Sequence, residues 1–345
     1  MRRLAALICA LLPLTAAAFN PAGLSFSHHD WELACDNTGT CRAAGYSSND
    51  ASDYAVSVLL TREAGPGQPV SGQVMLGQYG ENPVVESLPA KFKLALRING
   101  RAHGTLAFSK DALTADLGAS QVAALVAALA KNADIEMSMG RHAWRLSDSG
   151  AAAVLLKMDD YQGRVGTPGA LARKGSKPEA GVPAAVAAPR IALAPVAKAQ
   201  PADAQFLARH GKALRAALQA ATKEEDCGDL HDPAQTPELE AQRLSPTQML
   251  VSTRCWLAAY NAGSGYWVVN DKPPFQPVLA TASGSDYGDG KIGEQHKGRG
   301  LGDCWSSRTL GWDGKRFQLI EESSTGMCRL IAPGGAWALP TRVSR

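Results

Sequence analysis

The segment from Gly293 to Trp305, GEQHKGRGLGDCW, holds the side chains best suited to chemistry in this sequence. Lys297 and Arg299 place positive charge among four glycines, whose backbone amides can approach a ligand closely. That combination favours an anion such as a phosphate or a carboxylate. The alternative is a glycine-rich turn whose charges are only solvated. The candidate binding residues are His296, Lys297, Arg299, Asp303 and Trp305.

The same segment offers parts of a catalytic site. His296 could act as a base beside Glu294 or Asp303, with a hydroxyl from Ser306 or Ser307. The chain has no G-x-S-x-G elbow and no P-loop motif, and no triad spacing exists to test. We therefore assign no catalytic residue and favour a protein that is not an enzyme.

Metal ligands are poorly represented. His28 and His29 are adjacent but have no cysteine or carboxylate at ligand spacing. Asp286 and Asp289 do not have the spacing of an EF-hand, so a type I′ turn at Asp289 and Gly290 is favoured over calcium. The sequence therefore predicts no metal site and no cofactor.

The first residues predict export. Arg2 and Arg3 precede the apolar run LAALICALLPLTAAA, and Ala16 and Ala18 have the spacing that a signal peptidase recognises. The run is short for a bilayer span, which needs about 20 apolar residues, so we expect no transmembrane segment. Cleavage near Ala18 would release a mature chain from Phe19 into the periplasm or the medium.

Cysteine usage agrees with an oxidising compartment. Removal of Cys9 with the signal peptide leaves an even set of cysteines. No C-x-x-C occurs, which argues against a thioredoxin-type redox pair and a zinc ribbon. Many pairings are open in principle, and closeness along the chain favours three disulfides: Cys35 with Cys41, Cys227 with Cys255, and Cys304 with Cys328.

Composition and charge indicate a globular protein of about two domains. The chain has 345 residues, 45% of them hydrophobic, and a net charge of +3, which is too small for a nucleic-acid footprint. Residues 166–202 are rich in Ala, Pro and Gly and predict a flexible linker. The predicted division is a signal peptide at 1–18, an N-terminal domain at 19–165, the linker at 166–202 and a C-terminal domain at 203–345.

Both predicted domains are α+β, each an antiparallel sheet with one or two packed helices. In the first, residues 54–61 and 91–100 alternate apolar with polar, and Asn99 and Gly100 predict a hairpin turn into 101–108. Ser120 can cap a helix over 121–133. Further elements are expected as strands at 134–139 and 143–147 and a helix within 150–164.

The second domain is predicted to open with a helix over 203–226, capped by Asp203. Residues 283–304 contain many glycines and no aliphatic run, so we expect a long loop there. Short β-like runs separated by turn residues predict a meander with strands at 249–261, 265–271, 278–284, 316–322, 327–332 and 337–343.

Two motifs resemble a known family. DWELACDNTGTCRAAGY, from Asp30 to Tyr46, and HKGRGLGDCW, from His296 to Trp305, resemble the signatures of a family of exported Gram-negative bacterial proteins described only as a domain of unknown function. The resemblance covers nearly the whole mature chain apart from the linker. It implies export and architecture, but no activity, catalytic residue or cofactor. The first motif is also similar to the opening of invasion-associated locus B proteins.

Three classes of function remain open. The favoured one is a non-catalytic exported binding or structural module, because no complete catalytic constellation can be assembled. The second is a proteinaceous inhibitor of an envelope-degrading hydrolase such as a lysozyme. The third is a cell-envelope hydrolase. We expect the partner to be an envelope protein or an anionic envelope component, and not a nucleic acid.

Overall fold

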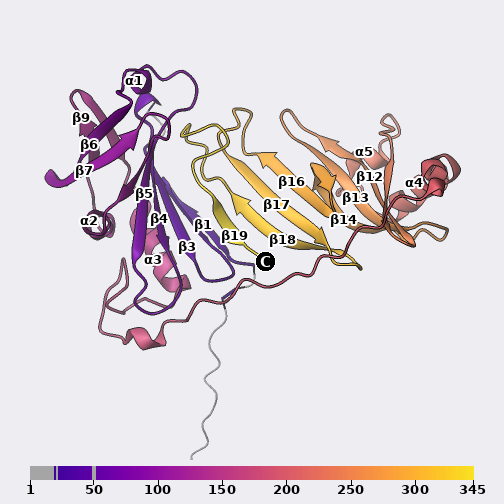
Figure 1. The fold of residues 1–345 in the computed structure, drawn as a ribbon, viewed down its shortest axis with the longest axis horizontal. Helices are drawn as coiled ribbons and strands as arrows, with labels where there is room; N and C mark the ends of the chain where they lie inside the picture. The colour runs from indigo at the N-terminus through magenta and orange to yellow at the C-terminus, as the bar shows by residue number, and fades with distance from the viewer. Residues whose placement is uncertain (1–18, 21, 49–51) are drawn as a thin grey trace, which may run out of the picture.

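The computed structural model describes residues 19–20, 22–48 and 52–345, and the predicted signal peptide at 1–18 lies outside the described residues. The described chain is β-rich, with four antiparallel sheets and few helices (Figure 1). None of the described helices is both long and apolar enough to span a bilayer. The predicted β-rich architecture of antiparallel sheets is therefore confirmed.

The N-terminal half contains two sheets. One has six strands in the order β1-β2-β3-β4-β5-β8, which are β1 (Leu24–His28), β2 (Trp31–Cys35), β3 (Cys41–Tyr46), β4 (Val56–Arg62), β5 (Val70–Leu76) and β8 (Thr114–Leu117). The other has four strands in the order β10-β9-β6-β7, which are β6 (Lys91–Ile98), β7 (Arg101–Ser109), β9 (Ile135–Met139) and β10 (His142–Leu146). The predicted turn between β6 and β7 is confirmed, since Asn99 and Gly100 have φ of 51° and 74°.

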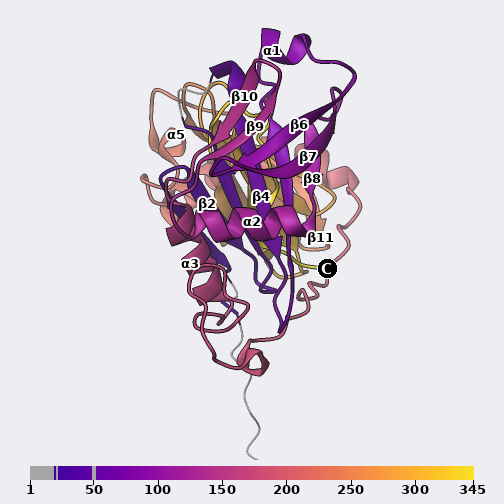
Figure 2. The same ribbon diagram turned by 90° about the vertical axis from the view of Figure 1, so that its left-hand side faces the viewer.

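Helices cover these sheets. They are α1 (Pro83–Glu86), α2 (Ala119–Leu129) and α3 (Ala151–Tyr161), with a 3-10 turn η1 (Ser52–Tyr54). Figure 2 shows α2 lying across the strands, and its apolar face is buried there as predicted. The predicted cap at Ser120 is wrong. Gly118 precedes the helix instead, and the Gln121 side chain accepts a hydrogen bond from the backbone N–H of Gly118 at 2.9 Å.

The C-terminal half also contains two sheets. The first has the order β11-β12-β13-β14, with β11 (Glu240–Ser245), β12 (Gln248–Leu257), β13 (Ala262–Asn270) and β14 (Val278–Gly284). The second has the order β15-β16-β17-β18-β19, with β15 (Asp286–Gly288), β16 (Lys291–Lys297), β17 (Trp305–Trp312), β18 (Phe317–Ser324) and β19 (Leu339–Arg342).

One amphipathic helix, α4 (Phe206–Ala221), packs on the first of these sheets through Leu214 and Leu218. It follows the 3-10 turns η2 (Glu179–Gly181) and η3 (Pro201–Gln205), and a short helix α5 (Gly228–His231) comes after it. The predicted cap at Asp203 is wrong. Gln205 precedes α4, and Asp203 lies within η3, where its carboxylate accepts hydrogen bonds from the backbone N–H of Gln200 and from the buried guanidinium of Arg243.

Two predictions for the C-terminal half are corrected. Residues 283–304, predicted as a long loop, are mostly β15, β16 and the turn between them. Ile292 and Glu294 are buried on one face of β16, and the many glycines around them hid this alternation in the sequence. Residues 327–332 are not a strand. Met327 and Ile331 pack against the N-terminal half, and that contact uses their apolar side chains without strand pairing.

The two halves meet through a shared cluster of buried side chains. Tyr46, Ala55 and Leu59 from the N-terminal half contact Ile331 and Leu339 from the C-terminal half. β19 lies close to β2, between the halves in Figure 1. Residues 166–202, predicted as a linker, run along both halves. Their backbone amides donate to carbonyls at Thr38, Arg345, Trp312 and Leu244.

Candidate functional site

The five predicted binding residues lie together where β16 leads into β17. His296 and Lys297 end β16, Trp305 begins β17, and Lys297 pairs with Trp305 across the two strands. Arg299 and Asp303 belong to the turn between them. The strand pairing therefore gathers residues that the sequence had placed in one long loop.

Arg299 and Asp303 form an ion pair inside this turn. The guanidinium Nε donates to Oδ1 of Asp303 at 2.7 Å, and Nη2 donates to Oδ2 at 2.5 Å. The Asp303 side chain is fully buried and also accepts from the backbone N–H of Leu330 at 2.8 Å. Arg299 therefore braces the turn, and its charge is already matched by a carboxylate of this chain.

The pKa values of the pair reflect this contact. Burial raises the pKa of Asp303, but the hydrogen bonds from Arg299 and from Leu330 outweigh burial and hold it below its usual value. The hydrogen bond to Asp303 raises the pKa of Arg299. Both groups are therefore charged across the physiological range.

Lys297 has a different environment. Its Nζ lies 5.5 Å from the centroid of the Trp305 ring, a cation–π geometry. The indole N–H of Trp305 donates to the carbonyl of Gly302 at 3.0 Å, which fixes the ring against the turn. Of these two cations, Arg299 is paired with a carboxylate, and Lys297 forms no ion pair among the described residues.

His296 is not joined to either acid by a described hydrogen bond. Its ring lies 5.4 Å from that of Trp256, and its Nε2 is buried without a hydrogen-bond partner among the described residues. Glu294 accepts from Thr281 at 2.6 Å and pairs with Arg308 at 3.1 Å. Because Glu294 and Asp303 are both committed elsewhere, the described contacts assemble no acid–histidine relay.

The three predicted cysteine pairings are confirmed, because each pair of sulfur atoms lies at disulfide-bond distance. Asp303, Cys304 and Cys328 also lie close enough together to suggest metal ligands. Two of their donor atoms are disulfide sulfurs, and the carboxylate is bound by Arg299. This cluster therefore has the chemistry of a structural brace, since a metal needs the free thiolate.

The predicted turn at Asp289 and Gly290 is also confirmed, with φ of 50° and 75°.

The two sequence motifs contact the same segment, residues 327–330, at the contact between the halves. Glu32 accepts from the Tyr46 hydroxyl at 2.5 Å and from the backbone N–H of Met327 at 2.7 Å. Asp30 pairs with Arg329 at 2.7 Å. The disulfide at Cys304 and the Asp303 carboxylate hold this same 327–330 segment from the other side. Both motifs therefore serve to join the two halves.

Sequence reasoning missed an apolar surface beside the candidate site. Leu257, Tyr260, Leu301 and Leu330 are 67%, 47%, 54% and 37% exposed. The segments that carry Tyr260, Leu301 and Leu330 touch one another, and Leu257 begins the hairpin that carries Tyr260. A side chain added at Gly300 would contact the Tyr260 ring, Asn261 bonds the backbone of Lys297, and Leu330 bonds Asp303. Isolated leucines carry no such signal in a sequence, because only folding brings them together.

Replacing Asp303 with asparagine should lower the free energy of unfolding by about 2 kcal/mol at neutral pH, because a buried charge-assisted bond is lost. A carboxylate with a lowered folded pKa stabilises above its ordinary pKa of about 3.9 and loses that contribution as the pH falls through the folded value. The difference between wild type and variant should therefore shrink below about pH 4. Urea titrations from pH 7 to pH 2 measure it.

Asp289→Asn is the matched control for this experiment, since Asp289 is exposed and asparagine suits its positive φ. It should change stability by less than about 0.5 kcal/mol at every pH. A difference between wild type and Asp303→Asn that stays constant down to pH 2 would contradict the role given to the carboxylate charge.

Comparisons with known proteins agree with the family resemblance. A family model described as "Protein of unknown function (DUF1176)" matches residues 25–344. The uncharacterised protein YpfG of Escherichia coli strain K12 is 25% identical over 356 residues, covering 95% of this chain and 95% of that protein. No solved structure gives a significant match. The family match spans both motifs and the apolar surface beside the second one.

Proposed function

We propose that this chain, which belongs to the family of proteins of unknown function DUF1176, is a non-catalytic binding protein of the cell envelope. It is exported after cleavage near Ala18 and acts in the periplasm or outside the cell. The three disulfides support this location, because such bonds persist in oxidising compartments.

The apolar surface formed by Leu257, Tyr260, Leu301 and Leu330 carries this proposal. Exposed apolar side chains that gather at one place are typical of protein interfaces, where tryptophan is also enriched. Trp305, with Lys297 over its ring, lies beside the surface. The turn that presents Leu301 is braced by an ion pair and a disulfide, so little conformational entropy is lost on binding.

A protein partner fits this surface better than an anionic envelope component. Arg299 is neutralised by Asp303, which leaves Lys297 as the cation available to an anion at this turn. The exposed neighbours are aliphatic or aromatic. We therefore propose that the partner is another envelope protein that buries Leu301 and Tyr260.

We also propose that residues 19–165 and 203–345 are separate folding units joined by the linker at 166–202. Each half has a core of its own, one around Trp31 and Leu94 and the other around Leu214 and Trp267. The contacts of Glu32 and Asp30 with the 327–330 segment then hold the two units in one orientation.

A photo-cross-linking amino acid at position 301 or 260, introduced in cells that make the protein, tests the proposed interface. Both positions should yield an adduct with one protein of discrete mass. Val278 is the matched control, because it is 60% exposed but lies far from the proposed interface. It pairs with Val268, which is about 20 Å along β13 from the Tyr260 loop. Adducts absent at 301 and 260, or equally strong at 278, would contradict the interface.

Two further measurements separate the other classes of function. A lysozyme titrated with the mature protein should keep its activity, whereas loss of activity at a one-to-one ratio would identify an inhibitor. Peptidoglycan fragments incubated with the protein should be recovered unchanged, and turnover would show that the protein is an enzyme.

A further inference from the structure

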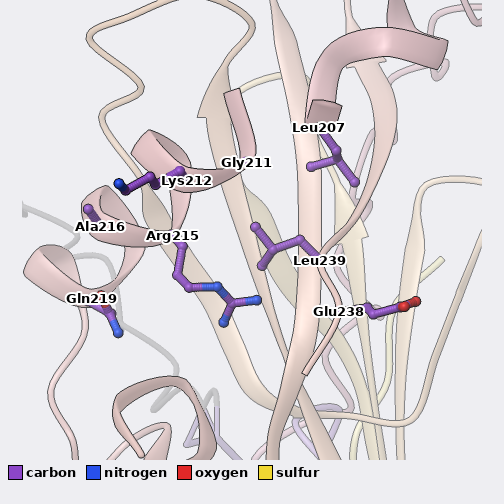
Figure 3. Close-up of a pocket in the computed structure, with 8 residues that line it drawn as sticks. All are labelled: Leu207, Gly211, Lys212, Arg215, Ala216, Gln219, Glu238 and Leu239. Carbon is purple, nitrogen blue, oxygen red and sulfur yellow. The ribbon is translucent and has the colours of Figure 1, made fainter. Parts of the chain in front are cut away.

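A groove runs along α4, the helix at the right-hand end of the C-terminal half in Figure 1. It has a volume of about 630 Å³ and lies between the helix and the extended chain that enters β11 (Figure 3). Its lining includes Leu207, Gly211, Arg215 and Gln219 from the helix and Glu238 and Leu239 from the extended chain.

The helix wall of this groove is straight and regular. Leu207, Gly211, Arg215 and Gln219 follow one another at four-residue spacing, so they share one face of α4. Twelve residues of helix span about 18 Å, which is the length of about five residues of extended chain. The groove therefore has the dimensions of a short peptide strand.

Gly211 opens the middle of this wall. Glycine inside a helix is less stable than alanine, because it loses more backbone freedom on folding. A side chain placed at Gly211 would meet no heavy atom within 4 Å, so the packing of the described residues does not require glycine there. Its effect is to leave room for another chain against the helix backbone, opposite Leu239.

The opposite wall is the edge of a sheet. β11 ends the order β11-β12-β13-β14, and no described strand lies on its outer side. The chain itself uses one end of this edge, where the backbone N–H of Ala197 donates to the carbonyl of Leu244. The groove lies at the other end, where Glu238 and Leu239 line it just before β11 begins. A groove between a helix and an open strand edge is the geometry by which extended peptides add to a sheet.

The charges on the helix wall form no ion pair with a carboxylate among the described residues. Lys212 is exposed and takes part in no described salt bridge, and Arg215 donates to the backbone carbonyl of Pro237. A ligand carboxylate would complement this wall, whereas Glu238 on the opposite wall would repel one, so the carboxylate belongs on the helix side of the groove. Leu207 and Leu239 favour an apolar side chain beside it.

We propose that this groove binds an extended segment of a partner protein, which adds to the open edge of β11 and carries a carboxylate on the side that faces α4. A small side chain of the segment lies over Gly211, and a carboxylate reaches Lys212 and Arg215. This site is distinct from the apolar surface at Leu301 and does not depend on it.

Selection of random seven-residue peptides displayed on phage, using the whole mature protein, tests the proposal. Counter-selection uses Gly211→Leu, which fills the groove and should keep or raise the melting temperature because leucine favours the helix. Enriched peptides should contain Asp or Glu. Added to the protein, they should slow hydrogen exchange of the amides at 239–242.

Affinity measurements on synthetic copies of the enriched peptides complete the test. Lys212→Glu should weaken binding by about tenfold or more, whereas Lys91→Glu, an exposed lysine on β6, should change it less than about twofold. Lys212→Glu also keeps the test decisive if Gly211→Leu fails to fold. Binding that survives both groove variants, no enrichment over the counter-selection, or a dimer of this chain that Gly211→Leu disperses would overturn the proposal.

Discussion

Replacing Asp159 with alanine should lower the free energy of unfolding by about 3–5 kcal/mol, because it leaves a buried guanidinium without its charge partner. The side chains of Arg62 and Asp159 are 1% and 0% exposed, and they pair at 2.7 Å. Asp159 also accepts from the backbone N–H groups of Leu171 and Ala172 at 2.7 and 2.9 Å. One carboxylate thus ties β4, α3 and the start of residues 166–202 together.

Asp160→Ala is the matched control, since the next residue of the same helix pairs with Lys157 while 62% exposed. Exposed pairs of this kind stabilise by less than about 1 kcal/mol, and the control should stay within that range. Urea unfolding measures both variants. Equal losses for Asp159→Ala and Asp160→Ala would refute the special role of the buried pair.

Replacing Trp31 with alanine should cost about 3–5 kcal/mol of stability, through lost burial and the cavity that remains. Trp31 is fully buried, its ring lies over Gly45, and its indole N–H donates to the carbonyl of Ser147 at 2.8 Å. A β-carbon at Gly45 would sit 2.3 Å from the ring, so the glycine is needed for this close approach.

Trp31→Phe separates volume from hydrogen bonding in the same measurement. It keeps an aromatic ring but leaves the Ser147 carbonyl without the indole donor, so its loss should be smaller, about 1–3 kcal/mol. A Trp31→Ala variant as stable as wild type, or a Trp31→Phe variant as unstable as Trp31→Ala, would contradict this account.

The two motifs that carry the family resemblance act mainly on the structure. Trp31 anchors the N-terminal core, and Glu32 and Asp30 receive the 327–330 segment that Cys328 ties to the second motif. Burial raises the pKa of Glu32, partly offset by hydrogen bonds from Tyr46 and Met327 and by the charge of Arg329. Functional residues are therefore better sought among the exposed side chains in and beside the motifs, such as Leu301, than among their buried residues.

The sequence by itself determined the features that depend on neighbouring residues. The family resemblance is confirmed by the match over residues 25–344. The disulfide pairings are confirmed by the distances between their sulfur atoms. They could be predicted because their partners are only 6, 28 and 24 residues apart, and short loops close at low entropic cost. The turn at Asn99 and Gly100 and the buried face of α2 follow from local backbone preferences and from helical periodicity.

Only the tertiary structure decided which groups meet across the chain. Asp30 accepts a hydrogen bond from Arg329, and Asn37 accepts one from the backbone N–H of Val343, in each case across about 300 residues. No local sequence pattern specifies such partners. The same holds for the candidate site. Arg299 and Asp303 were both predicted to bind a ligand, but the structure pairs them with each other. The apolar surface at Leu301 and the groove at Gly211 also arise only in the fold. Exposure and concavity depend on the packing of the whole chain, since each side chain is buried or left in water by elements distant in sequence.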